Sequence, residues 1–208
     1  MSVYSYIIDA GHGSIKNGAY TTSGKMFIFP DGFTIYEGVI NRGIAKWLKR
    51  GLIKEGIDFS VVYHEIEDTS LVSRVNLANS IYLKDKRAIY LSIHSNSSAA
   101  PNIGLGKGFE IFTYFGQSNS DKVADIFGTT YKKFFPEFPF RAETSDGDLD
   151  KEANLYVLRE TKCPALLVEN LFFDNREEAE YLASEKGQQT IANCLLACIK
   201  EMERVKPI

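Results

Sequence analysis

Three short apolar runs of this 208-residue chain each end in a residue that can bind a metal or move a proton. They occupy residues 6–13, 89–94 and 165–170, and they carry His12, His94 and Glu169. Short apolar runs bounded by turn signals are typical of buried strands in a parallel sheet. Open α/β sheets bind ligands at the carboxyl ends of their strands. The pattern predicts an α/β fold with a mostly parallel, twisted central sheet flanked by helices, and a functional site at the C-terminal edge of the strands.

The composition fits one globular domain. The chain has 24 Lys and Arg against 27 Asp and Glu, a formal charge of -3. It therefore has no excess of basic residues that would favour binding to nucleic acid or to anionic lipid. Hydrophobic residues make up 44%, which excludes a disordered chain. A chain of this length can bury about 70% of its unfolded surface in one core. We expect a single domain over residues 1–208, without a linker or internal repeat, and a monomer.

The cysteines and the N-terminus indicate a reducing compartment. Cys194 and Cys198 lie one helical turn apart in an apolar stretch, where a disulfide would be strained, so we expect buried free thiols. The N-terminus lacks the basic and apolar regions of a secretory signal. No run of about 18 apolar residues could span a membrane. These features predict synthesis in the cytoplasm without a signal peptide.

The helices and loops are predicted from periodicity, caps and turn residues. Helices are expected from Glu37 to about Lys54, from Ser70 to about Leu83, and from Asn119 to Phe135. A terminal helix is expected from Asn175 to about Glu203, with Glu178 completing a capping box. Further strands are expected at residues 59–63 and 109–114. Residues 13–34 are expected to form a loop or a small hairpin, and loops are expected at 95–107 and 136–153, the last with the acidic residues Asp146, Asp148 and Asp150.

His12 and His94 are informative as a pair. Either one alone could hold a tight turn through a backbone hydrogen bond, whereas two imidazoles at one sheet edge can bind a metal. Glu37, at the predicted start of a helix, adds a carboxylate, although there it would also complement the helix dipole by about 0.3–1 kcal/mol. Two imidazoles, one ligating carboxylate and a second carboxylate as base match a catalytic zinc site.

Glu169 is the carboxylate best suited to move a proton. It follows the apolar residues 165–168, and Leu171 to Phe173 come shortly after it. Such surroundings raise a carboxyl pKa toward neutrality, which suits a group that takes a proton from water and returns it to a leaving amine. Asp9 is expected either to orient a ligand imidazole or to cap a loop. His64, beside acidic residues, is expected at the surface.

Seven short motifs follow one another along the chain. They are Asp9-Ala10-Gly11-His12-Gly13, Glu37 with Asn41, Leu71-Val72-Ser73-Arg74 with Ala78-Asn79, Ser92-Ile93-His94-Ser95-Asn96, Gly108-Phe109-Glu110, Leu158-Arg159 before Pro164 to Glu169, and Asn175 with Glu178. In this order they resemble the zinc-dependent N-acetylmuramoyl-L-alanine amidases of the Amidase_3 type. Many members of that family have Pro at the position of Ala10 and Gly at that of Ser14, and neither change removes a ligand.

The resemblance implies a site and a reaction. His12, Glu37 and His94 would hold Zn²⁺, and Glu169 would be the catalytic acid/base. The substrate would be peptidoglycan, cut between the lactyl group of N-acetylmuramic acid and L-Ala of the stem peptide. Arg74 and Asn79 are expected to serve the packing of their helix. Action on the cell wall after release, as by a phage endolysin, and recycling of wall fragments are the two expected roles.

Three other interpretations stay open at this point. Another zinc amide hydrolase or a carboxypeptidase would use the same ligands, although the sequence shows no obvious Arg to hold a substrate C-terminal carboxylate. A non-catalytic peptidoglycan-binding module would not need both Glu37 and Glu169. A metal-free α/β binding protein would contain no stoichiometric zinc.

Overall fold

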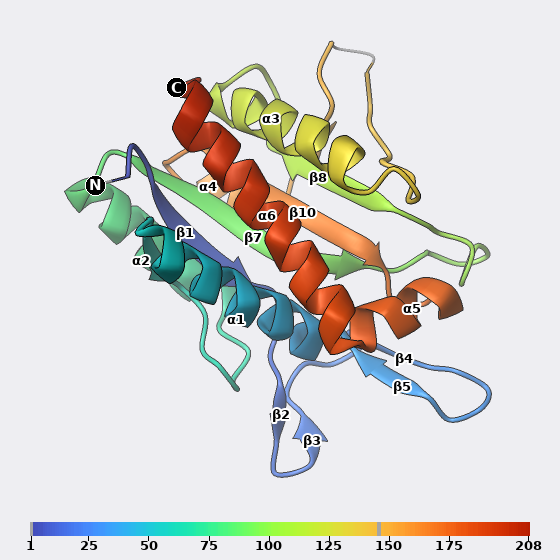
Figure 1. Ribbon diagram of the computed structural model, residues 1–208. Coiled ribbons are helices and arrows are strands. Elements are labelled where there is room, and N and C mark those ends of the chain that lie inside the picture. Colours follow the sequence, from blue (N-terminus) through green and yellow to red (C-terminus); the bar gives the residue numbers. More distant parts are fainter. Residues whose placement is uncertain (1, 145–146) are drawn as a thin grey trace.

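The computed structural model describes residues 2–144 and 147–208, which are built around one six-stranded sheet (Figure 1). In spatial order its strands are β6 (Asp58–Val61), β1 (Ser5–Ala10), β7 (Ala88–Asn96), β10 (Ala165–Phe172), β8 (Phe109–Thr113) and β9 (Lys151–Glu152). The first four run parallel to one another, whereas β8 is antiparallel to β10. The predicted mostly parallel α/β sheet is therefore confirmed.

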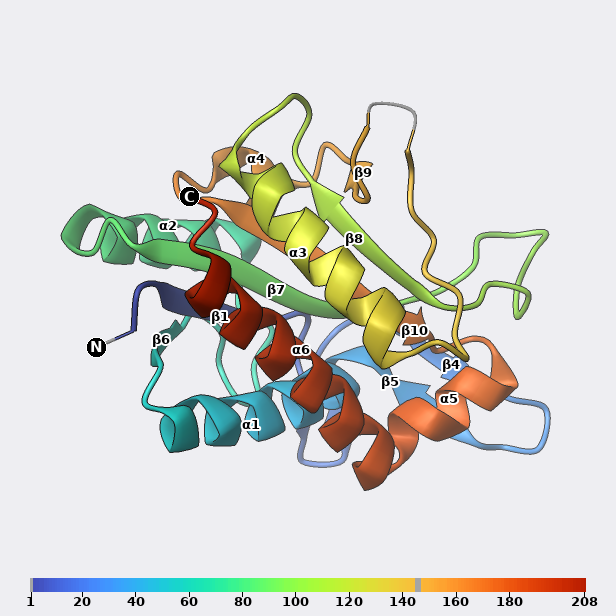
Figure 2. The ribbon, with the colours of Figure 1, turned by 45° about the horizontal axis from the view of Figure 1, so that its top comes forward.

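Helices cover both faces of the sheet (Figures 1 and 2). The larger core packs one face against α1 (Glu37–Glu55), α3 (Asn119–Phe134) and α6 (Glu185–Val205), and the smaller core packs the other face against α2 (Leu71–Lys84) and α4 (Tyr156–Glu160). Alternate strand residues point to opposite faces, so each strand supplies both cores. The three predicted helices before β10 begin within one residue of their expected positions.

The predicted single helix from Asn175 to Glu203 is wrong, because the chain forms α5 (Arg176–Ala183) and then α6. Ser184 between them has an extended backbone, and its Oγ accepts a hydrogen bond from the Gly187 amide at 2.9 Å. A Cβ at Gly187 would lie 2.0 Å from the Tyr181 carbonyl oxygen. The break therefore depends on a serine cap and a glycine that lets two helix ends meet closely.

Only half of the predicted capping box at Asn175 forms. The Asn175 side chain accepts a hydrogen bond from the Glu178 amide at 3.3 Å, as a cap should. The Glu178 carboxylate instead accepts hydrogen bonds from the amides of Phe172 at 2.7 Å and Gly108 at 2.8 Å. Glu178 thus joins the end of β10 to the start of β8, next to the predicted site.

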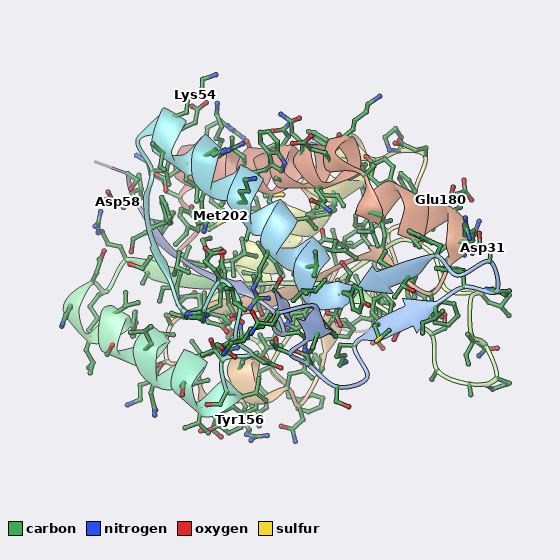
Figure 3. The ribbon with its side chains drawn as sticks, turned by 90° about the horizontal axis from the view of Figure 1, so that it is seen from below. Asp31, Lys54, Asp58, Tyr156, Glu180 and Met202 are labelled. Carbon is green, nitrogen blue, oxygen red and sulfur yellow. The ribbon has the colours of Figure 1, made fainter. Side chains whose placement is uncertain are left out.

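Short strands occur in two of the three predicted loop regions, and the sequence had allowed for a small hairpin only in residues 13–34. Residues 13–34 include β2 (Ile15–Lys16) paired with β3 (Ala19–Tyr20), and β4 (Met26–Ile28), whose partner is β5 (Thr34–Tyr36). Figure 3 shows Asp31, between β4 and β5, beside Glu180 of α5, and Arg176 donates to both carboxylates at 2.6 Å. The loop at 136–153 contains β9, and Asp146 of its acidic cluster lies outside the described residues.

The cysteine prediction is confirmed. Cys163, Cys194 and Cys198 are buried and have free thiols. None of the helices in the described ranges combines the length and apolar content that a bilayer span requires.

Candidate metal centre

The fold brings His12, Glu37 and His94 together at the predicted edge of the sheet. His12 follows β1, His94 lies on the neighbouring β7, and Glu37 is the first residue of α1. Glu37 Oε1 lies 2.9 Å from His94 Nδ1, and Glu37 Oε2 lies 3.1 Å from His12 Nε2. The two imidazoles meet edge to face, with ring centroids 4.9 Å apart. Among the described residues, these three form a group whose ligand atoms lie close enough together to hold one metal ion.

The backbone around His12 is shaped for this arrangement. His12 has a φ of 64°, a left-handed conformation that costs free energy in residues other than glycine and often marks a functional site. A Cβ at Gly11 would lie 2.1 Å from His94 Cε1. Gly11 is therefore needed because the imidazole of His94 occupies the space a side chain would take.

The donor set fits a divalent cation. His12 Nε2 is buried, and although it lies near Glu37 it makes no hydrogen bond within the described part of the chain. Burial alone would raise the pKa of Glu37, but its contacts with His12 and His94 hold that pKa well below the usual range. Burial lowers the pKa of His94, and its contact with Glu37 more than offsets this, so the pKa is raised. An ionised carboxylate and two imidazoles at one point are the ligands that zinc takes at catalytic sites.

Glu169 lies beside this group. It pairs with His94 in the register of β7 and β10, so both side chains point to the same face of the sheet. Its Oε2 is buried without a hydrogen-bond partner among the described residues. Burial raises the pKa of Glu169 to about 8, although the charge of His94 acts in the opposite direction. The pKa of this carboxyl is therefore raised toward neutrality, as its apolar sequence neighbours predicted.

Sequence reasoning missed Arg42, which holds the His12 turn. Its buried guanidinium donates to the carbonyl oxygens of Gly11 at 3.3 Å, His12 at 2.6 Å and Gly13 at 3.1 Å. One side chain of α1 thus donates hydrogen bonds to all three residues of the turn, Gly11 to Gly13. The sequence contained no signal for this role, because α1 also carries Lys46, Lys49 and Arg50, which are basic in the same way.

Arg74 and Asp9 have roles that differ from those predicted. Among the described residues, the Asp9 carboxylate accepts hydrogen bonds from Tyr90 Oη at 2.7 Å and Ser92 Oγ at 2.9 Å and pairs with Arg74, and it makes no hydrogen bond to an imidazole. Arg74 also donates to the His12 carbonyl oxygen at 3.1 Å. Arg74 therefore does more than pack its helix, since it ties α2 to the chain that carries His12.

Two further predictions concern Asn79 and His64. Asn79 donates to the Glu160 carbonyl oxygen at 3.0 Å and accepts from the Lys162 amide at 2.8 Å, so it links α2 to the chain before β10, as a structural residue would. His64 is exposed, as predicted, and its Nδ1 accepts a hydrogen bond from the Glu67 amide at 3.0 Å.

A pocket of about 570 Å³ opens beside His12, His94 and Glu169. Its apolar wall comes from Leu71 of α2, Tyr156 and Val157 of α4, and Leu167 of β10. Figure 3 shows Tyr156 at the α2 side of the molecule. The volume is in the range of sites for small organic ligands.

Comparisons with known proteins agree with this geometry. The chain is 34% identical over 187 residues to N-acetylmuramoyl-L-alanine amidase CwlM of Bacillus licheniformis, covering 89% of this chain and 63% of that protein. It is 27% identical over 201 residues to the endolysin of Bacillus phage SPP1, covering 96% of this chain and 66% of that protein. The chain thus spans slightly less than two thirds of the length of these two relatives.

Solved structures share the fold. The crystal structure of an N-acetylmuramoyl-L-alanine amidase from Clostridium difficile 630 superposes with a TM-score of 0.78 at 25% identity, covering 99% of this chain and 100% of that one. The catalytic domain of CwlV from Bacillus (Paenibacillus) polymyxa var. colistinus gives 0.71 at 25% identity, covering 97% and 99%. The family model described as N-acetylmuramoyl-L-alanine amidase, Amidase_3, matches residues 7–201. The chain belongs to this amidase family, as its ordered motifs predicted.

Proposed function

We propose that this protein is a zinc-dependent amidase that hydrolyses the bond between the lactyl group of N-acetylmuramic acid and L-Ala of the peptidoglycan stem. The observation that carries the proposal is the convergence of His12, Glu37 and His94 beside the buried carboxyl of Glu169, in a chain of this family. A domain that only bound peptidoglycan would have no use for an acid/base group at a metal centre.

His12, Glu37 and His94 would hold the zinc. Zinc bound there would supply a Lewis acid that polarises the substrate carbonyl and makes a water more acidic. Glu169 would accept a proton from the attacking water as the water oxygen forms its bond to the amide carbon. Glu169 then donates the proton to the alanine nitrogen as the carbon–nitrogen bond breaks. The products are a lactyl carboxylate and a stem peptide with a free amino terminus.

The elevated pKa of Glu169 supports this role. A carboxyl with its usual pKa is a weak base that is almost fully ionised at neutral pH, so it would accept a proton from water poorly, whereas one with a pKa near neutrality can both accept and donate.

A zinc carboxypeptidase is the second candidate, and one observation favours it. The sequence argument against it was the absence of an Arg near the site. In the structure Arg141 contacts Glu110, which lies directly opposite Glu169 in the β8–β10 register. An arginine in that place could bind the terminal carboxylate of a peptide.

Digestion of purified peptidoglycan, with mass spectrometry of the products, separates the two. The amidase releases stem peptides with a free L-Ala amino terminus. A carboxypeptidase shortens stems that stay on muramic acid, and that result would contradict the proposal. Glu169→Gln should keep its zinc and lose turnover by roughly 10²–10⁴-fold, the range of general acid/base contributions.

A further inference from the structure

A second, polar pocket of about 430 Å³ lies where the end of β7, the end of β10 and the start of β8 come together. Its lining includes Asn96, Ser98, Glu110, Arg141 and Phe172. None of these residues has a role in the hydrolytic steps described above. The pocket borders the predicted loops at residues 95–107 and 136–153.

Strand order places this pocket in line with the reacting groups. His94, Glu169 and Glu110 occupy three adjacent strands, β7, β10 and β8, and are paired directly in both registers. All three side chains therefore point to one face of the sheet, spaced by about 4.8 Å for each strand. A ligand group held near Glu110 would lie roughly 10 Å from His94 by this spacing.

Glu110, which lines the pocket, contacts two cations, and one of them, Arg141, lines the pocket as well. The Glu110 side chain is 5% exposed, and it accepts from Arg141 Nε and Lys151 Nζ at 2.6 Å each. Asn96 Nδ2 donates to its other oxygen at 2.6 Å. Two cations around one carboxylate leave a net charge of +1. The Arg141 side chain is 45% exposed, so the charge is accessible to a ligand.

The backbone fixes Arg141 in place. Its amide donates to the Phe109 carbonyl oxygen at 2.8 Å, and the Phe109 amide donates to the Pro139 carbonyl oxygen at 2.9 Å. The guanidinium lies over the Phe172 ring, 5.3 Å from its centroid. Arg141 is thus held by an adjacent strand, a buried carboxylate and an aromatic ring, which makes it a preorganised anion-binding group.

We propose that Arg141, supported by Lys151, binds a free carboxylate of the departing stem peptide and makes the enzyme selective for stems that carry one near the scissile amide. The inference rests on the proposed function, since Glu169 must donate to the leaving nitrogen. Glu169 lies between His94 and Glu110 on one face of the sheet, so a peptide that extends from that nitrogen across Glu169 would reach Glu110 and its two cations.

Two synthetic muropeptides test this subsite. They are identical except that the second stem residue carries either a free carboxylate or the corresponding carboxamide. The zinc-loaded enzyme should cleave the carboxylate form with the higher kcat/KM. In Arg141→Gln, kcat/KM for that form should fall about 10- to 100-fold, mainly through KM, as expected for a charge-assisted hydrogen bond. The carboxamide form should be cleaved as by wild type.

Arg141→Lys and Arg204→Gln complete the experiment. Arg141→Lys keeps the charge and should recover part of the selectivity, whereas Arg204→Gln, on the distant end of α6, should change nothing. The subsite would be overturned if Arg141→Gln lost activity equally on both substrates, or if it kept full activity on both. Either result would leave the proposed amidase function unaffected. A wild-type enzyme that cleaves neither muropeptide would overturn the proposed function, and the subsite with it.

Discussion

Arg74 of α2 and Asp9 of β1 form an ion pair in which both side chains are at most 2% exposed. The pair closes the smaller core directly below the turn that carries His12. Tyr90 and Ser92 donate hydrogen bonds to the other Asp9 oxygen, so both oxygens of the buried carboxylate have partners. The same guanidinium reaches the carbonyl oxygens of Ala10 and His12, which makes the pair part of the support of the candidate metal centre.

Arg74→Met should destabilise the protein by about 3–5 kcal/mol, because it leaves Asp9 buried without its cation. Urea unfolding of the metal-free protein measures this free energy. The double variant Arg74→Met with Asp9→Leu should recover much of the loss. Arg87→Met, which removes an exposed partner of Asp85, is the matched control. An equal effect of the Arg74 and Arg87 substitutions would contradict the role given to the buried pair.

Gly11→Ala should impair metal binding more than folding. The added Cβ would overlap the His94 ring, so the imidazole must leave its place beside Glu37. We expect zinc affinity to fall by at least about 10-fold, the lower end of the effect of disturbing the support of a metal ligand. Gly43→Ala is the control, because its Cβ meets only the end of the flexible Gln188 side chain. Unchanged affinity in Gly11→Ala would show that His94 is not confined as described.

Arg42→Lys should weaken zinc binding by roughly 10- to 100-fold. A lysine keeps the charge but lacks the planar fork that reaches several carbonyl oxygens of the His12 turn at once. Competition with a chromophoric chelator gives the dissociation constant. Arg50→Lys, at an exposed position of the same helix, should bind zinc as wild type does. An Arg42→Lys variant with the zinc affinity of wild type would show that the conformation of the His12 turn does not depend on the Arg42 hydrogen bonds.

The stability of the metal-free protein should depend on the ionisation of Glu169. Its pKa rises from 4.5 to about 8 because of burial, so the folded state retains a proton that the unfolded state releases. The contribution to stability is complete below about pH 4.5 and is lost as the pH rises through about 8. The difference in free energy of unfolding between wild type and Glu169→Gln should therefore shift with pH across this window. A difference that is constant from pH 4 to 9 would contradict the elevated pKa.

Much of the site followed from the sequence because strand ends are local features. The apolar runs before His12, His94 and Glu169 fix where each strand stops, and parallel strands bring those ends to one edge. Glu37 was predictable as the first residue of a helix. The groups that hold these residues were harder to foresee. Arg42 and Arg74 act through contacts with distant backbone carbonyls, and nothing in a local pattern distinguishes such an arginine from a solvated one.

The differences in the fold have the same origin. The strands of the hairpins at residues 15–36 and the strand β9 are two or three residues long, too short for a recognisable alternation. The sequence therefore predicted only a loop or a small hairpin in the first region and no strand in the second. The end of α5 at Ser184 depends on how closely Gly187 approaches Tyr181, which is a tertiary contact. The Glu178 carboxylate likewise does not complete the expected capping box, because it accepts hydrogen bonds from the backbone amides of Phe172 and Gly108, which are tertiary contacts rather than local ones.

Zinc reconstitution tests the central claim most directly. Protein stripped with a chelator would be titrated with zinc while hydrolysis of a muropeptide is followed, with His94→Ala in parallel. We predict that activity is absent in the stripped protein, returns in full at one zinc per chain, and never returns in His94→Ala. A stripped protein that remains fully active, or a His94→Ala variant that regains activity at the same zinc ratio, would contradict the assignment of His12, Glu37 and His94 as the catalytic metal site.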